Sequence, residues 1–410
     1  MNYYRLFTSN IKIMLFAILL TLYSGFGQTF VLSLYIPAII EDFAISSTLF
    51  SSIYAAATIC SGFTMIFAGK LIDRVSLMRF TKVVVLGIIT ANLVAGLTLN
   101  LFMLFLAFFL LRFFGQGLLS HTSMTSMGRY FSYARGKALS IAYLGFPLAE
   151  AILPVTIITL ILVVGWRETF FLSAIFILIT LLPLVWYLIK DFDKSKVVES
   201  AEITRRKVAT GNQPDKEWTQ KEIIRNRYFY IFAPTAFING FSLTALFFFQ
   251  VFIAESKGWT AGWMAFSISA YAVSSFIFSI LSGPLVDRFS PRKVFPFVTL
   301  PLAAGLLVLI LFDHPSAAML FWFLTGITAG ANPTTSNALY AETYGVKNLG
   351  SIRSIFTFVM IISTAAGPVV YSFLTDQGFT YNHIHLLLTG VIFLNFLYIL
   401  WGLSWQKARM

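Results

Sequence analysis

Charged residues are scarce in this chain. Asp, Glu, Lys and Arg make up 11% of its 410 residues, whereas 58% of the residues are hydrophobic. Soluble domains contain about a quarter charged residues, so this composition excludes an ordinary soluble domain. Apolar runs of about 20 residues recur along the whole length, and each is long enough to cross a bilayer as a helix. The sequence therefore predicts an all-α integral membrane protein.

Cysteine and several catalytic motifs are also missing. The single cysteine, Cys60, excludes an internal disulfide and a cysteine metal site. No Gly-rich loop ends in Lys-Ser/Thr, so ATP is not expected to drive the protein directly, and no His-Glu-x-x-His spacing indicates a metal. No nucleophile and base stand at a spacing that favours an intramembrane hydrolase. We expect neither an enzyme nor a cofactor.

The apolar runs predict twelve membrane-spanning helices. The first run is too long for the core of a cleaved signal peptide and is interpreted as the first span. The predicted spans are residues 11–37, 48–69, 82–99, 101–128, 138–164, 169–189, 229–254, 262–284, 294–312, 316–340, 351–374 and 384–405.

Positive charge lies almost wholly on one side of these spans. All but three of the 29 Lys and Arg residues fall in the termini and in the loops of that side. The exceptions are Arg167 and Lys257 on the other side and Arg112 inside a span. Such a bias marks the cytoplasmic face, so both termini are predicted to be cytoplasmic. The net charge of +12 is thus a sign of topology and not of nucleic-acid binding.

A charged stretch that follows the second span occurs again after the eighth. Residues 69–74 are Gly-Lys-Leu-Ile-Asp-Arg and residues 283–288 are Gly-Pro-Leu-Val-Asp-Arg, an offset of 214 that also relates Pro154 to Pro368. A constant offset predicts a duplicated half. We predict an N-terminal six-helix bundle at 1–190, a cytoplasmic linker at 191–227 and a C-terminal six-helix bundle at 228–410, with the bundles related by pseudo-symmetry.

Polar residues gather on every third span. Polar side chains inside hydrocarbon must face protein or water, so we expect spans 1, 4, 7 and 10 to surround a central cavity that binds the substrate. The stripes comprise Ser24 and Gln28 in span 1; Arg112, Gln116, Ser120 and Ser123 in span 4; Asn239 and Gln250 in span 7; and Thr325, Thr328, Asn332 and Ser336 in span 10. From these we predict substrate binding by Arg112, Gln116, Gln28, Asn239 and Asn332.

The paired loop motifs resemble those of the major facilitator superfamily. The stretch Arg-Phe-Phe-Gly-Gln-Gly at 112–117 also resembles the span-4 arginine motif of that superfamily. Residues 117–128 and 135–154 are similar to bacterial members near the monocarboxylate transporters and oxalate/formate antiporters. Those relatives carry a basic residue in span 8, whereas residues 265–281 contain none. The drug-antiporter motif of span 5 is absent as well, since Gly-Phe-Pro-Leu-Ala-Glu stands at 145–150.

The resemblance implies a latch at the inner side of the membrane. In the outward-facing state, the acidic residue after span 2 would meet the positive N-terminal end of span 11, and the acidic residue after span 8 would meet span 5. The neighbouring arginines would hold these carboxylates by charge-assisted hydrogen bonds. The alternative is a static, positively charged loop. The latch residues would be Asp73, Arg74, Asp287, Arg288 and Arg353.

Two charged residues are predicted to lie deep in the bilayer. Arg112 falls ~16 Å from one end of its span and Glu150 ~18 Å from one end of span 5, at 1.5 Å per residue. Either charge buried alone costs several kcal/mol, so each needs a partner or a role. Three interpretations stay open. The two residues form a structural ion pair, or Arg112 binds an anionic substrate while Glu150 carries the proton, or Glu150 is simply protonated and packed.

We therefore expect a secondary transporter that works by alternating access. It should move a small organic solute together with protons, and an anion is favoured over a neutral solute. The first alternative is proton-driven efflux of drugs or metabolites, and a more remote one is a non-transporting receptor or scaffold. The expected surroundings are the lipid bilayer of a plasma membrane, here a bacterial inner membrane. The expected partners are the small-molecule substrate and protons, no nucleic acid is expected, and the protein is expected to be a monomer.

Overall fold

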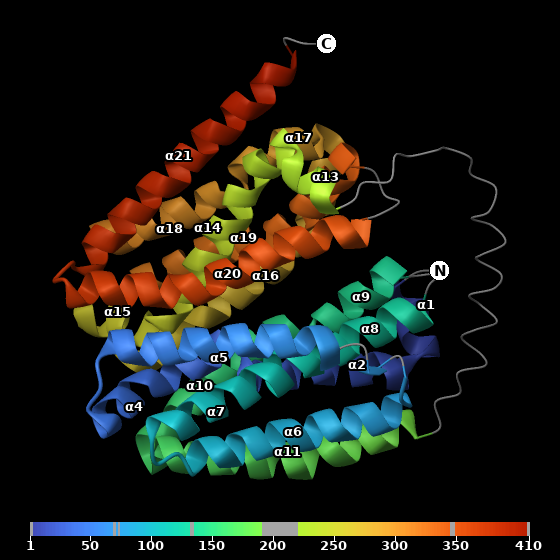
Figure 1. Cartoon of the computed structure of the whole chain (residues 1–410), viewed down its shortest axis with the longest axis vertical. Helices are drawn as coiled ribbons and strands as arrows, with labels where there is room; N and C mark the ends of the chain where they lie inside the picture. Colours follow the sequence, from blue (N-terminus) through green and yellow to red (C-terminus); the bar gives the residue numbers. More distant parts are fainter. Residues whose placement is uncertain are drawn as a thin grey trace. The chain divides into compact units, whose positions relative to one another are not determined.

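The computed structural model describes residues 3–68, 71–72, 74–131, 135–190, 220–344 and 349–407, and within these ranges the regular structure is helical (Figure 1). The helices are α1 (Tyr3–Ser9), α2 (Ile11–Tyr23), η1 (Ser24–Gly27), α3 (Thr29–Leu32), η2 (Ser33–Tyr35), α4 (Ile36–Phe43), α5 (Ser47–Ala68), α6 (Leu77–Gly96), α7 (Leu101–Leu110), η4 (Leu111–Leu119), α8 (Ser120–Tyr130), α9 (Arg135–Tyr143), α10 (Gly145–Val164), α11 (Trp166–Ile189), α13 (Gln220–Arg225), α14 (Arg227–Phe248), α15 (Gln250–Ser256), α16 (Ala261–Phe289), α17 (Pro291–Val294), η6 (Phe295–Thr299), α18 (Leu300–Leu311), α19 (Ser316–Tyr344), α20 (Leu349–Asp376) and α21 (Tyr381–Lys407).

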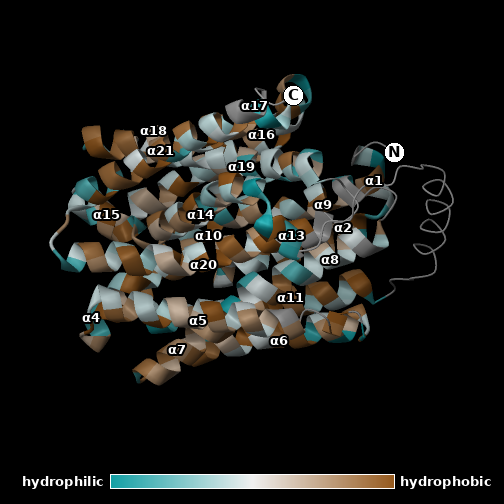
Figure 2. Cartoon of the chain, turned by 45° about the horizontal axis from the view of Figure 1, so that its top comes forward, coloured by the Kyte–Doolittle hydropathy of each residue, from teal (hydrophilic) through white to brown (hydrophobic). Residues whose placement is uncertain are grey.

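Most of these helices are long and apolar enough to cross a membrane. Among the described residues ten helices qualify, and the bent pair formed by Ile11–Gly27 and Thr29–Phe43 adds an eleventh span. The predicted tenth span is α19, 29 residues long, whose polar stripe leaves it too hydrophilic to qualify by composition alone. Figure 2 shows the apolar character clearly along α7, whose sequence is Leu-Phe-Met-Leu-Phe-Leu-Ala-Phe-Phe-Leu. The predicted all-α membrane fold is confirmed.

Several spans begin at a side-chain cap. The first N–H groups of a helix have no acceptor within it, and a Ser, Thr or Asn side chain placed just before the helix supplies one. The side chain of Asn100 accepts a hydrogen bond from the N–H of Met103 at 2.9 Å, where α7 starts. Thr260 does the same at the start of α16, from the N–H of Trp263 at 3.1 Å. Asn100 and Thr260, which lie between the predicted spans, thus determine where these helices start.

The chain divides into two compact units. One comprises Met1–Ala44 and Ala56–Gln213, and the other comprises Ile45–Ala55 and Pro214–Met410. The start of α5 belongs to the second unit, where the hydroxyl of Ser372 donates to the carbonyl of Ser47 at 3.2 Å and Thr48 is hydrogen-bonded to Asp376. The helix α13, at the end of the predicted linker, also packs in this unit, with Ile223 fully buried.

Two pairs of equivalent helices pack together inside each unit. In the first unit α2 packs on α10 and α6 packs on α11, which are spans 1 with 5 and 3 with 6. In the second unit α14 packs on α20 and α18 packs on α21, which are spans 7 with 11 and 9 with 12. The pairing of these spans follows the offset of 214 residues in the sequence and agrees with a duplicated half, whereas the predicted bounds of the two bundles and of the linker stay a prediction.

Two spans depart from the straight helices that the sequence predicts. Span 1 is broken at Gln28, whose backbone is extended (φ −85°, ψ 153°), and its two parts are bent by 42°. It also continues to Phe43 instead of ending at residue 37. In span 4, residues Leu111–Leu119 form a π-helix, a form often found at functional sites. Both departures lie where the polar stripes of the first unit were predicted.

Candidate functional site

The break in span 1 and the π-helix of span 4 touch through two glycines. A Cβ atom added to Gly27 would lie 2.2 Å from the carbonyl oxygen of Leu111 and 2.7 Å from the amide nitrogen of Gln116. A Cβ added to Gly115 would lie 2.7 Å from the Cα of Gly27. Real Cβ atoms do not approach other atoms so closely, so only glycine at both positions allows this backbone contact. The contact brings the two irregular segments together.

Arg112 extends from the π-helix to the broken span. Its side chain is 3% exposed, and its Nη1 donates a hydrogen bond to the hydroxyl of Thr29 at 3.0 Å. Thr29 is the first helical residue after the break at Gln28. The geometry therefore holds a buried positive charge beside the interrupted helix. The sequence predicted Arg112 as a site residue but not Thr29, because a threonine next to Gln28 gives no sign of its own that it holds an arginine.

Two glutamines flank this charge in the chain. Gln28 is the residue at the break, and Gln116 lies four residues after Arg112; both are half-buried. Neither side-chain amide makes a hydrogen bond to another residue within the described part of the chain. An amide offers two donors and an acceptor oxygen, so the pair can meet hydroxyl, carbonyl or carboxylate groups of a solute. Arg112, Gln28 and Gln116 form the candidate binding site of the first unit.

Glu150 lies on a helix that packs against the segment just before the break. It belongs to α10, whose Ala149 and Leu153 pack on η1, where a Cβ added to Gly25 would lie 2.9 Å and 2.6 Å from their side chains. Glu150 is half-buried and, among the described residues, makes no ion pair or hydrogen bond, with Arg112 or otherwise. The structural ion pair considered from the sequence is therefore not formed in this structure.

Asn239 occupies a buried polar cluster of the second unit. Its side chain is 3% exposed and donates to the carbonyl of Thr235 at 3.1 Å. The hydroxyl of Thr235 accepts a hydrogen bond from Asn395 of α21, also at 3.1 Å. The Oδ1 atoms of both asparagines are buried and have no hydrogen-bond partner among the residues that the structure describes. Asn395 was not singled out from the sequence, although an asparagine in span 12, which has few polar residues, was a visible signal.

The polar residues of span 10 differ in their burial and in their hydrogen-bond partners. Asn332 is half-buried, and its side-chain oxygen accepts a hydrogen bond from Ser336 at 2.9 Å. Thr325 and Thr328 are fully buried, and the hydroxyl of Thr328 accepts from the N–H of Leu302 at 3.1 Å. The expectation that the whole stripe lines a cavity is thus wrong for its first half, because Thr328 caps the neighbouring helix α18.

The proposed latch residues are only partly described. Asp73 lies outside the described residues, as does the side chain of Arg353, whose backbone belongs to α20. Arg74, Asp287 and Arg288 are exposed, and the guanidinium of Arg288 lies 5.2 Å from the ring centre of Phe289. No ion pair joins Asp287 to Arg288 in the described residues. The latch stays a prediction.

The acidic, histidine and cysteine residues of the described ranges are those that could bind a metal ion. No group of three or more His, Cys, Asp or Glu residues lies close enough to hold a metal ion within the ranges that the structure covers. The chemistry that the site offers is therefore that of a cation, two amides and a separate carboxyl group. A cation and amides of this kind can bind and orient a solute, and a carboxyl group can take up and release a proton, whereas none of these groups is a nucleophile positioned for covalent chemistry.

Comparison with known proteins gives a consistent result. A family model described as the Major Facilitator Superfamily matches residues 17–268 and 232–408. The crystal structure of the nucleoside transporter NupG aligns over 98% of this chain and 98% of its own, with a TM-score of 0.71 and 12% identity. A bacterial homolog of the human lysosomal transporter Spinster, in an inward-facing and unoccupied conformation, aligns over 95% of this chain and 94% of its own, with a TM-score of 0.67 and 13% identity.

A curated relative matches over a shorter stretch. The probable plastidic glucose transporter 1 of Arabidopsis thaliana is 32% identical over 88 residues. The match spans 22% of this chain and 17% of that protein, well under two thirds of its length. At these levels of identity the solved structures show a shared fold, and the solutes in their names belong to those proteins alone.

Proposed function

This chain belongs to the Major Facilitator Superfamily and is a membrane transporter, and we propose that it moves a small organic anion together with protons. The single observation that carries the proposal is the buried guanidinium of Arg112, held by Thr29 at the break of span 1. Interrupted helices inside a membrane bundle are where transporters place their solute sites. An anionic group of the solute would accept charge-assisted hydrogen bonds from N–H groups of this guanidinium.

Glu150 supports the coupling to protons. An ionisable residue inside a membrane span marks a proton or ion pathway by default, because a charge kept there without a partner is costly. Glu150 is half-buried on α10, which packs on η1 next to the break, and it makes no ion pair among the described residues. We assign it the site where a proton is bound and released during transport.

The transport cycle that we propose is alternating access. The two units share two equivalent helix pairs, and the substrate would be exposed to the two sides of the membrane in turn. Asp73, Arg74, Asp287, Arg288 and Arg353 would form contacts present in one state and absent in the other, which is what a switch between two states requires. We propose that the protein works as a monomer in a bacterial inner membrane, with both termini in the cytoplasm.

The decisive experiment separates exchange from accumulation. The purified protein is reconstituted into liposomes and offered radiolabelled mono- and dicarboxylates, with and without an inward proton gradient. Arg112→Ala should lose both exchange and accumulation. Glu150→Gln should still exchange labelled for unlabelled solute but lose the accumulation that the gradient drives. Arg167→Ala is the matched control, since this arginine pairs with Asp42 at 2.7 Å, away from the candidate site.

The outcome that contradicts the proposal is equally definite. If Arg112→Ala and Glu150→Gln both accumulate the solute at the rate of the unmodified protein, neither residue has the proposed role. Size-exclusion profiles that match the unmodified protein establish that a loss of transport in a variant is not a loss of folding.

A neutral polar solute is the second candidate. The two half-buried amides of Gln28 and Gln116 favour it, because amides pair with hydroxyl and carbonyl groups as well as with carboxylates. Nucleosides and sugars therefore belong in the same uptake panel. Uptake of such solutes that survives Arg112→Ala but fails in the Gln28→Ala and Gln116→Ala variants would favour this candidate over an anion. Transport in inverted vesicles distinguishes the efflux alternative from uptake.

A further inference from the structure

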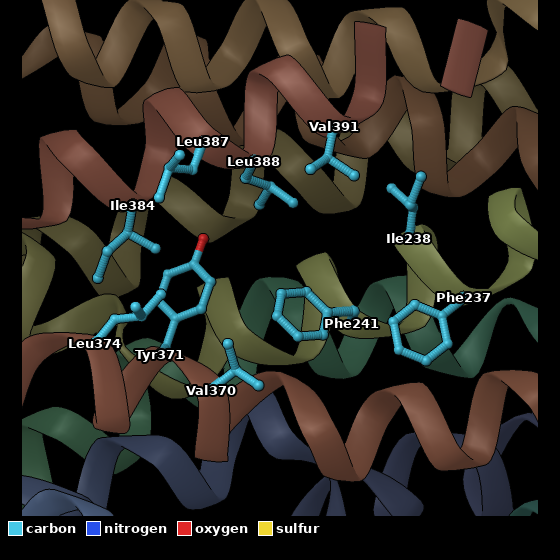
Figure 3. Close-up of a pocket in the computed structure, with 10 residues that line it drawn as sticks. All are labelled: Phe237, Ile238, Phe241, Val370, Tyr371, Leu374, Ile384, Leu387, Leu388 and Val391. Carbon is cyan, nitrogen blue, oxygen red and sulfur yellow. The ribbon is translucent and has the colours of Figure 1, made fainter. Parts of the chain in front are cut away.

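An apolar groove runs between three helices of the second unit. It encloses about 230 Å³ and is lined by α14, α20 and α21, as Figure 3 shows. The lining side chains are Phe, Ile, Leu and Val, with one tyrosine, Tyr371. The groove lies outside the candidate binding site of the first unit. Its occupant is therefore a separate question from the transported solute.

The groove is open along one side. The side chains at its mouth are exposed, with Leu387 at 55% and Val391 at 48%, whereas those at its floor, such as Leu388 at 6%, are buried. On α21 the groove is lined by residues between Ile384 and Val391. They lie three to ten residues after Tyr381, the first residue of the helix, and therefore ~5 Å to ~15 Å along its axis at 1.5 Å per residue. Apolar residues exposed on a membrane-spanning helix face hydrocarbon. The mouth is thus accessible to lipid.

Tyr371 carries the polar group of the groove. Its side chain is 1% exposed, and its hydroxyl makes no hydrogen bond to any residue that the structure describes. Figure 3 shows the oxygen directed across the groove towards Leu387 and Leu388. A buried hydroxyl left without a partner costs free energy, so a ligand that brings an acceptor gains by filling this position.

We propose that this groove binds one acyl chain of a membrane phospholipid, with the ester carbonyl of that chain accepting a hydrogen bond from Tyr371. The depth agrees with this occupant. Tyr371 lies five residues before Asp376, the last residue of α20, and therefore ~8 Å from the end of the span. Lipid ester groups lie at the edge of the hydrocarbon core, and tyrosine hydroxyls reach this level from within a span. The chain would continue inwards past Phe241 and Phe237.

The test compares two lipids that differ only in their ester carbonyl groups, which the diether lacks. The purified protein is titrated with a diester phospholipid and with its diether analogue of the same head group and chains, and bound lipid is counted by native mass spectrometry. The unmodified protein should bind the diester about three- to tenfold more tightly than the diether, the effect of one hydrogen bond in an apolar site. Tyr371→Phe should lower diester binding to the diether level and leave diether binding unchanged.

Two further variants test the groove itself. Leu387→Trp places an indole in the mouth and should reduce binding of both lipids. Leu386→Trp is the matched control: Leu386 is 57% exposed on the same helix but does not line the groove, so binding should persist. Both positions are exposed, so neither change disturbs the core.

Three results would overturn the inference. The first is a diester preference that Tyr371→Phe does not alter. The second is lipid binding that Leu387→Trp leaves intact. The third is retention of added oleate in place of phospholipid, which would assign the groove to a free fatty acid. None of these results bears on the solute carried through the candidate site, because solute transport is measured separately.

Discussion

At the scale of single residues, the contact between Gly27 and Gly115 is the most restrictive feature of the first unit. Gly27→Ala would place a methyl group 2.2 Å from the backbone oxygen of Leu111. Neither backbone can move without disturbing the break or the π-helix, so we expect a loss of about 1–3 kcal/mol of stability and impaired transport. The melting temperature of the purified variant and its uptake rate are the measurements.

The control for this substitution is another glycine within a span. A Cβ at Gly390 in α21 would meet no atom of the described part of the chain within 4 Å. Gly390→Ala should therefore melt within a degree or two of the unmodified protein, and transport should be unchanged. Equal melting temperatures for the two variants would show that the close contact has no structural importance.

The hydroxyl of Thr29 provides a second prediction at this scale. It accepts the hydrogen bond of Arg112 Nη1 at 3.0 Å. Thr29→Val keeps the shape of the side chain but removes the acceptor, which should cost about 1.5–3 kcal/mol of positioning energy for the charged group and reduce uptake at least tenfold. Thr29→Ser retains the hydroxyl and should stay within about threefold of the unmodified rate. Similar rates for Val and Ser would contradict a positioning role for the hydroxyl.

The sequence draws attention to some residues of the candidate site and not to others. Charged residues inside apolar runs are conspicuous, because their burial is costly, so the sequence alone marks Arg112 and Glu150 as candidates, whose roles stay predictions. The function of a threonine depends on its neighbours in space, which the sequence does not give. Thr29 supports an arginine, whereas Thr328 caps a helix, and nothing in their surroundings along the chain distinguishes them.

At the scale of helices, Thr328 holds the start of α18 in place. The N–H of Leu302 lies in the first turn of that helix and has no acceptor within it, so the hydroxyl of Thr328 supplies one. Thr328→Val would leave a buried N–H without a partner, and we expect a loss of about 1–3 kcal/mol. Unfolding in mixed micelles with rising fractions of a denaturing detergent measures the change.

Thr325 is the matched control on the same helix. It is also fully buried, but its hydroxyl donates to the carbonyl of Phe321 within α19, a carbonyl that already accepts a backbone hydrogen bond. Thr325→Val should cost less than about 0.5 kcal/mol, since no group is left without a partner. If the two valine variants unfold alike, the capping role assigned to Thr328 is wrong.

The positions of the helices were largely predictable, but their irregularities were not. Long apolar runs fix the spans because the bilayer has one thickness. The break at Gln28 and the π-helix at Leu111–Leu119 instead depend on the meeting of two glycines about 90 residues apart in the sequence. Each segment contains two glycines, which weaken a helix, but the sequence does not say that one segment breaks while the other forms a π-helix.

At the scale of the whole molecule, the sequence predicted the repeat through its constant offset. The motif at 69–74 and its copy at 283–288 predicted two equivalent halves, and the matched helix pairs within the two units agree with this. How each half uses its polar residues could not be predicted. Arg112 of the first unit and Asn239 of the second are both buried, but the cation contacts a broken span whereas the amide joins a cluster with Thr235 and Asn395.

The orientation of the molecule in the membrane gives a prediction at this scale. Gln377, in the turn between α20 and α21, and Lys293 of α17 are both exposed. The distribution of Lys and Arg places them on opposite sides, with Lys293 in the cytoplasm. In a Cys60→Ser background, an impermeant maleimide should label Gln377→Cys in intact cells but label Lys293→Cys only after permeabilisation. The reverse labelling would invert the proposed topology.

The backbone contact between Gly27 and Gly115 also constrains how this protein can evolve. A substitution of either glycine alone is unfavourable, because its side chain would meet the main chain of the opposite segment. Relatives that have lost one glycine should therefore have lost the other, and with it the kink of the first span. The two codons are expected to vary together, and a collection of such sequences would identify the transporters that bind their solute in another way.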